Sequence, residues 1–303
     1  MPVAEAVETY VALRRAAGFA FKSEGSCLKS FAAFCDARGE SYVRAQVAIE
    51  WAGLAQGVPQ RARRLGIVIR LARYLRAEDD RHEVPPAVFG AEKSPRPVPY
   101  ILSLDQIRQL IHAAAHSGYR TLRRETYRTL FALLACTGLR VSEAIRLRFD
   151  DITPDGLVIR CSKFRKSRLV PLHDTARAGL DRYLQRRCPY APDDDHVFVS
   201  LRRKPLILND VATAFQTAVR VVGLPPGPGR ARPTPHSLRH AFAVRALHTC
   251  PDGRDAITRH MVALSTYLGH AKVADTYWYL EAVPELMTDI ADRCECFVMG
   301  ERS

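Results

Sequence analysis

The chain has 303 residues and carries 45 Lys and Arg against 32 Asp and Glu, a formal net charge of +13. Its 47% hydrophobic and 25% charged content is that of an ordinary folded protein and excludes a largely disordered chain. No stretch approaches the roughly 20 apolar residues that a membrane span needs, and the N-terminus lacks the pattern of a secretion signal. The length predicts about two domains, and the excess of arginine favours a polyanionic partner such as nucleic acid.

The first part of the chain predicts a bundle of four short helices. Apolar residues recur there at helical spacing, and glycine or proline separates the segments. The expected helices cover residues 3–17, 28–37, 45–54 and 59–77. The last helix carries Arg63, Arg70 and Arg73 near one face, which predicts a stripe of phosphate contacts, with a solvated helix face as the alternative.

A proline-rich segment divides the chain in two. Residues 83–99 contain five prolines and no helical periodicity, a composition that is typical of an extended linker. We therefore expect a helical domain over 1–82, a linker over 83–102 and a second domain over 103–303.

The second domain is expected to be mixed. It opens with a helix capped by Ser103, and another helix is expected over 123–136. Two short β-prone runs, 157–161 and 168–172, flank the basic turn 162–167 and predict a hairpin. Mostly helical segments follow. The fold class expected for the whole chain is therefore mainly α with a small β-sheet.

The first two of four motifs in this domain are rich in basic residues. The motif T-G-L-R-V-S-E places Arg140 at a helix start, where a phosphate is favoured, and Glu143 one turn later, where it can hold that arginine. The hairpin turn S-K-F-R-K-S-R contains Lys163, Arg165 and Lys166, and a lysine on such a turn can act as a general acid. Taken alone, the first motif is better explained by a structural arginine. A solvated basic turn explains the second as well as a catalytic lysine does.

The other two motifs contain histidines. P-H-S-L-R-H puts His236 and Arg239 three residues apart on a helix. L-G-H ends at His270, and Tyr279 follows nine residues later with Tyr277 close by. A capped histidine beside a surface arginine, and packed aromatic rings, are the plainer interpretations of each motif taken alone.

The sequence lacks the common cofactor-binding and metal-binding motifs. The sequence contains no G-x-x-x-x-G-K, G-x-G-x-x-G or H-E-x-x-H motif, and its acidic residues do not cluster as a two-metal nuclease requires. None of the eight cysteines forms a C-x-x-C pair. We therefore expect neither a cofactor nor a metal.

Taken together and in this order, the four motifs resemble the signature of the tyrosine recombinase (phage integrase) family over residues 104–290. The stretch T-Y-W-Y-L-E around Tyr279 further resembles recombinases of multi-recombinase mobile elements. The resemblance implies an N-terminal helical core-binding domain that contacts DNA and a C-terminal mixed α/β catalytic domain. It also implies a site-specific recombinase that cleaves and rejoins DNA through a covalent 3′-phosphotyrosine, for integration or excision of a mobile element.

The resemblance implies a nucleophile and two histidine partners of the phosphate. Tyr279 is the expected nucleophile, because the nine-residue spacing from His270 favours it over Tyr277. His236 and His270 would hydrogen-bond the scissile phosphate, and His236 would assist proton transfer from the phenol. A phenol, with a pKa near 10, needs such help at neutral pH.

The resemblance also implies roles for the cationic residues. Arg140 and Arg239 would clamp the scissile phosphate, and Glu143 would hold Arg140 from behind. Lys163 would protonate the leaving 5′ oxygen, with Lys166 as the alternative. Arg165 and Lys166 are expected to contact DNA.

The expected partner is double-stranded DNA, with neither a nucleotide nor a membrane as a second partner. The family implies a tetramer on DNA, made of this chain alone or together with related recombinases. An apolar tail helix over 283–299 would dock into a neighbouring subunit, with packing on its own domain as the alternative. The expected location is cytoplasmic and nucleoid-associated. Two competing functions are DNA relaxation of the type IB topoisomerase kind and DNA binding without catalysis.

Overall fold

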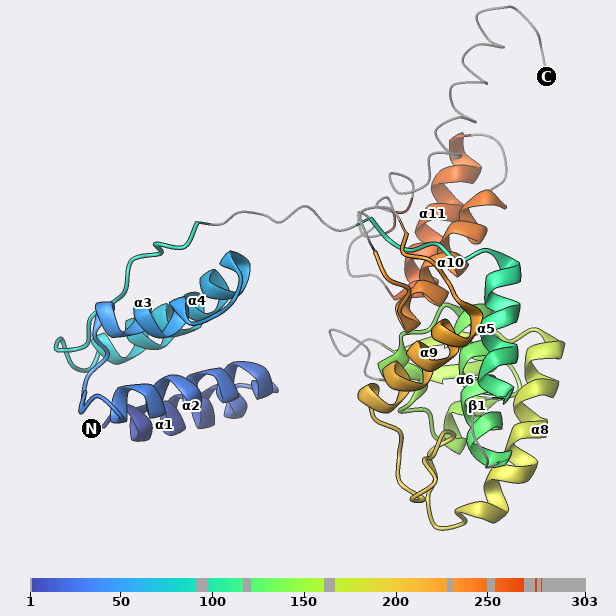
Figure 1. Cartoon of the computed structure of the whole chain (residues 1–303), viewed down its shortest axis with the longest axis horizontal. Coiled ribbons are helices and arrows are strands. Elements are labelled where there is room, and N and C mark those ends of the chain that lie inside the picture. The colour runs from blue at the N-terminus through green and yellow to red at the C-terminus, as the bar shows by residue number, and fades with distance from the viewer. Residues whose placement is uncertain are drawn as a thin grey trace, which may run out of the picture. The chain divides into compact units, whose positions relative to one another are not determined.

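The structure is a computed structural model that describes residues 2–90, 98–116, 121–160, 167–227, 231–249 and 254–269, together with Thr276 and Tyr279. The chain separates into two compact units, Met1–Arg96 and Pro97–Ser303 (Figure 1). Both are mainly helical, and the second contains a small sheet, which confirms the expected fold class. In the part of the chain that the structure describes, no helix combines the length and apolar character that a bilayer crossing requires.

The N-terminal unit contains four helices: α1 Val3–Ala16, α2 Lys22–Asp36, α3 Ala45–Gly53 and α4 Val58–Arg76. Their apolar faces meet in one core, to which Phe31, Trp51 and Leu71 contribute buried side chains. The predicted helices agree with the observed ones except at the start of α2, which lies six residues earlier than expected. Its first turn is polar and therefore shows no apolar periodicity.

The segment after α4 packs back onto this unit. The backbone N–H of Val43 donates to Nδ1 of the buried His82 at 3.1 Å. The Glu83 carboxylate accepts from the backbone N–H of Ala45 at 2.8 Å, at the first residue of α3, where N–H groups lack helical partners. Val84 and Phe89 also pack against the helical core. The start of the proline-rich segment is therefore held on the N-terminal unit.

The end of the same segment belongs to the other unit, since Tyr100 and Leu102 are buried in the C-terminal core. Between these two ends, residues 91–97 lie outside the described part of the chain. We propose that the chain forms one domain over 1–82 and a second over 103–303, with a linker between them.

The C-terminal unit is built around α6. Its helices are α5 Leu104–His116, α6 Thr121–Thr137, α7 Val141–Ala144, α8 Asp174–Tyr190, α9 Leu208–Val222, α10 Pro235–His248 and α11 Arg254–Leu268. Helix α6 packs against α5, α8 and α10 (Figure 1). In the core, the ring of Phe131 meets that of Phe215 edge-on. Ser103 caps α5, because its Oγ accepts from the backbone N–H of Gln106 at 3.1 Å.

A three-stranded antiparallel sheet lies between α7 and α8 in the chain, in the order β1 Ile152–Thr153, β2 Gly156–Ile159 and β3 Arg168–Val170. Strands β2 and β3 form the expected hairpin, with Leu157 opposite Val170. Strand β1 was not predicted, because two residues carry no detectable alternation. The sheet places Arg168, the first residue of β3, at the base of the hairpin turn.

Candidate active site

The T-G-L-R-V-S-E motif forms the junction between α6 and α7. Gly138 adopts a φ of +61°, which favours glycine, and a Cβ there would lie 2.5 Å from the ring of Phe242. This turn places Arg140 at the N-cap of α7. Its guanidinium donates to Oε1 of Glu143 at 2.8 Å and to the carbonyl of Gly269 at 2.9 Å, while 26% of its side chain stays exposed.

Glu143 is shared by two arginines. Besides Arg140, it accepts from Arg168, whose Nη1 and Nη2 lie 3.0 and 2.8 Å from its two oxygens. Burial raises the pKa of the Glu143 carboxyl, but hydrogen bonds from Arg168 and from the backbone N–H of Arg140 outweigh this and hold it at about 2. The ionised carboxylate therefore orients both guanidinium groups. The sequence predicted its pairing with Arg140 but not with Arg168.

We expect Glu143→Gln to lower the free energy of unfolding at neutral pH by about 3 kcal/mol, since each unit of pKa shift corresponds to about 1.4 kcal/mol. The carboxyl pKa lies below its ordinary value of 4.5, so its stabilisation is fully present above that pH and is lost as the pH falls toward 2. Urea unfolding at neutral pH and at about pH 3 checks this. A difference between the two proteins that does not shrink in acid would contradict it.

Arg239 is buried on α10, with a side chain that is 1% exposed. Its Nη1 donates to the carbonyl of Gly138 at 2.6 Å and its Nη2 to the carbonyl of Leu268 at 2.8 Å. Burial, and after it the charge of Arg140, lower the pKa of Arg239 to about 10, which leaves it cationic at neutral pH. The interpretation of this motif as a surface arginine is therefore wrong. The carbonyl partners are neutral and do not cancel the positive charge.

Two histidines of α10 contact each other, and one of them contacts Tyr279. His236 is exposed in the first turn, and its ring meets that of His240 edge-on with centroids 4.5 Å apart. Nδ1 of His240 lies 3.1 Å from the hydroxyl of Tyr279, whose side chain is 2% exposed and packs with Leu264 and its neighbours. His240 was not singled out from the sequence. Its spacing of four residues from His236, which places both on one helical face, was the available signal.

Four of the predicted site residues lie close enough together to interact electrostatically: Arg140, Glu143, Arg239 and Tyr279. The charges of Arg140, Glu143 and Arg168 and the phenol of Tyr279 all act on the pKa of Arg239. The turn after α11 connects them further, because Leu268 and Gly269 accept from Arg239 and Arg140 respectively. The site therefore combines three separate motifs of the sequence. Four predicted site residues lie outside the described part of the chain: Lys163, Arg165, Lys166 and His270. Tyr277 and the 283–299 tail also lie outside it.

The predicted basic stripe lies on the outer face of α4. Three of its arginines are exposed in the N-terminal unit: Arg63, Arg70 and Arg73. Arg63 also donates to Oγ of Ser23 at 3.1 Å. Two other arginines of this helix contact their own unit, since Arg61 donates to the carbonyl of Ala55 and Arg64 lies over the ring of Trp51. Contact between these three exposed arginines and a phosphate backbone stays a prediction.

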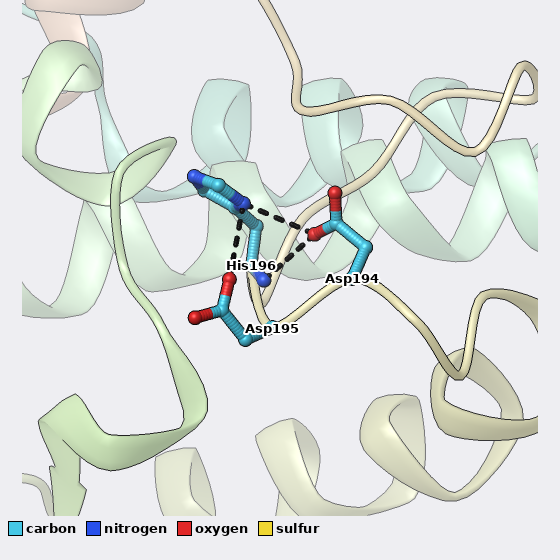
Figure 2. Close-up of side chains that lie close together, drawn as sticks. All are labelled: Asp194, Asp195 and His196. Carbon is cyan, nitrogen blue, oxygen red and sulfur yellow. Dashed lines mark hydrogen bonds and ion pairs between the residues drawn. The ribbon is translucent and has the colours of Figure 1, made fainter.

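A second group of ligating side chains lies in the loop after α8. Nδ1 of His196 is 3.0 Å from Asp194 and 3.5 Å from Asp195 (Figure 2). Both carboxylates also face arginines, Asp194 at 3.3 Å from Arg187 and Asp195 at 2.6 Å from Arg148. Because guanidinium groups already neutralise these carboxylates, we assign the group a structural role in holding the loop.

The sequence is similar to integrases and tyrosine recombinases. The sequence model of the phage integrase family matches residues 101–285. The chain is 36% identical to the putative integrase/recombinase y4rB of Sinorhizobium fredii over 96% of both proteins. It is 32% identical to the tyrosine recombinase XerD of Caulobacter vibrioides, over 76% of this chain and 72% of that protein.

Solved structures show the same fold at lower identity. A lambda integrase dimer bound to a core site matches with a TM-score of 0.65 and 20% identity, over 90% of this chain and 96% of that one. The Tn1549 transposon integrase in complex with transposon right end DNA matches with a TM-score of 0.64 and 16% identity, over 97% and 99%.

Proposed function

The chain belongs to the phage integrase family and is a tyrosine-type site-specific DNA recombinase, and we propose that Tyr279 cleaves DNA to form a covalent 3′-phosphotyrosine. The observation that carries this assignment is the joint placement of Arg140, Arg239 and Tyr279. Two guanidinium groups are held by one turn, close enough for the charge of one to lower the pKa of the other. Such a pair is suited to a phosphodiester, which supplies the negative charge that the carbonyl partners lack.

Arg140 and Arg239 stabilise the charge that develops on the non-bridging oxygens as the pentacoordinate phosphorus forms. The Tyr279 oxygen bonds to phosphorus, and the bond from phosphorus to the 5′ oxygen breaks. Lys163 protonates that 5′ oxygen, and His236 and His270 hydrogen-bond the phosphate. The phenolic proton passes to a histidine of α10. The phosphotyrosine keeps the energy of the broken phosphodiester, so the strand is rejoined by the reverse reaction without a nucleotide.

The proposed substrate is double-stranded DNA. Arg63, Arg70 and Arg73 on α4 contact its phosphates, together with Arg165 and Lys166 of the hairpin turn. The proposed location of the protein is the nucleoid, within the cytoplasm. Binding that depends mainly on phosphates weakens steeply as salt concentration rises.

We also propose that the active assembly is a tetramer on DNA, formed by this chain alone or with related recombinases. The support comes from lambda integrase, whose structures include a dimer bound to a core site and a tetramer bound to a Holliday junction. The Tn1549 integrase acts for a transposon, which favours integration or excision of a mobile element as the outcome.

The proposal is tested by trapping protein-linked DNA. Wild-type protein and Tyr279→Phe are incubated with a random-sequence duplex library and with bacterial genomic DNA, denatured rapidly, and the linked DNA ends are sequenced. We expect covalent DNA from the wild type alone, with ends that cluster at one sequence. The phenylalanine variant has the same ring and lacks only the attacking oxygen, so it is the matched control.

Three other results would contradict the proposal, each in a different way. Ends scattered over many sequences would favour relaxation of the type IB topoisomerase kind. Equal amounts of linked DNA from both proteins would exclude Tyr279 as the nucleophile. No linked DNA from the wild type would favour binding without catalysis.

A further inference from the structure

The contact between His240 and Tyr279 goes beyond the roles assigned above. Nδ1 of His240 lies 3.1 Å from the Tyr279 hydroxyl, and the two ring centroids are 5.4 Å apart. The two residues are 39 positions apart in the sequence, so the tertiary fold and not the local chain creates this contact. A general base must lie about 2.6–3.2 Å from the proton-bearing atom, and this distance falls in that range.

The surroundings of His240 hold its ring in place. It lies in the middle of α10, one residue after Arg239, and both side chains are buried. The exposed ring of His236 packs edge-on against it, with an interplanar angle of 81°. Tyr279 is held from its other side by the apolar cluster that includes Val244, Met261 and Leu264. The distance between base and nucleophile is therefore set by packed side chains.

The chemistry of the phenol creates the need for such a base. A phenol with an ordinary pKa near 10 is almost entirely protonated at neutral pH, and its oxygen attacks slowly unless the proton is removed as the bond to phosphorus forms. A neutral histidine with its proton on Nε2 presents Nδ1 as an acceptor.

We propose that His240, and not the exposed His236 beside it, is the general base for Tyr279. The phenolic proton moves to Nδ1 of His240 while the Tyr279 oxygen bonds to phosphorus and the 5′ oxygen leaves with a proton from Lys163. In rejoining, the 5′ hydroxyl returns its proton to Lys163 as its oxygen bonds to phosphorus, and His240 returns its proton to the departing phenol oxygen. This inference rests on the proposed function, because it requires Tyr279 to be the nucleophile.

The first experiment compares His240→Asn with wild type in single-turnover cleavage. The DNA is the duplex that wild-type protein captures in the trapping experiment above. Asparagine can place an oxygen where Nδ1 stands and keeps the hydrogen bond, but it is not a base. We expect the cleavage rate at saturating DNA to fall about 10²- to 10⁴-fold with DNA affinity unchanged. His248→Asn, at the exposed end of the same helix, is the control and should cleave like wild type.

The second experiment separates a base from a residue that merely positions the phenol. Tyr279 is replaced, by genetic encoding, with a ring-fluorinated tyrosine whose phenol ionises below neutral pH. An ionised phenol needs no base, so the difference between His240 and His240→Asn should shrink to within about tenfold. A difference that stays as large as with ordinary tyrosine would overturn the proposal, because loss of packing is not repaired by ionisation.

A third comparison uses only protein that keeps His240, so it does not depend on whether the His240→Asn variant folds. In the protein that keeps His240, the fluorinated nucleophile should bring at most a few-fold gain, because the base already removes the proton. A gain of tenfold or more would contradict the proposal. Failure of the proposed function is recognised separately, since wild-type protein would then capture no DNA or Tyr279→Phe would capture as much.

Discussion

Arg239→Ala will slow DNA cleavage by about 10²- to 10³-fold or more while the affinity for DNA changes little. The Arg239 guanidinium is buried and donates to two carbonyls, those of Gly138 and Leu268, so it is too enclosed to serve as a general backbone contact. Arg140→Ala should have a similar effect, because its partly exposed guanidinium completes the proposed clamp. Single-turnover cleavage and fluorescence anisotropy measure the two quantities separately.

The control for charge is Arg220→Ala, which removes an exposed arginine from the last turn of α9. A substrate with a neutral methylphosphonate at the cleaved position adds a sharper comparison. Such a phosphorus centre develops less charge in the transition state, so the defect of the Arg239 variant should become smaller on it. A loss of binding as large as the loss of cleavage would instead make Arg239 a structural residue or a general phosphate contact.

The second large effect is on stability and concerns Arg187. This side chain of α8 is fully buried, and its guanidinium donates to the carbonyls of Ala191 and Asp194, each at 2.7 Å, and to that of His196. Arg187→Ala leaves these acceptors without their donor and opens a cavity. We expect the C-terminal unit to lose about 3–5 kcal/mol of unfolding free energy.

Urea unfolding of the two proteins measures this loss. The control is Arg182→Ala, five residues earlier on the exposed side of the same helix, for which we expect a change within about 0.5 kcal/mol. A loss below about 1 kcal/mol for the Arg187 variant would show that water replaces the guanidinium at the three carbonyls.

Local patterns of the sequence were enough to predict most of the fold. Apolar periodicity located α1, α3 and α4 within a residue or so, and the β-prone runs on either side of the basic turn located β2 and β3. The early start of α2 and the short strand β1 were missed. Neither a polar helical turn nor a two-residue strand carries a repeating apolar signal.

The candidate site was predictable as a set of residues but not as an arrangement. The motifs identified Arg140, Arg239 and Tyr279, and the spacing of three residues anticipated the pair of Arg140 with Glu143. The contacts of Arg168 with Glu143 and of His240 with Tyr279 join residues 25 and 39 positions apart. Such long-range contacts leave no trace in periodicity or composition, so only the fold reveals them.

The most direct test of the central claim is to identify the amino acid that becomes linked to DNA. Covalent complexes are digested with nuclease and trypsin, and the peptide over residues 273–293, which contains both Tyr277 and Tyr279, is fragmented by mass spectrometry. The account predicts a nucleotide attached through its 3′-phosphate to Tyr279. A nucleotide on Tyr277, or a linkage through a 5′-phosphate, would contradict it.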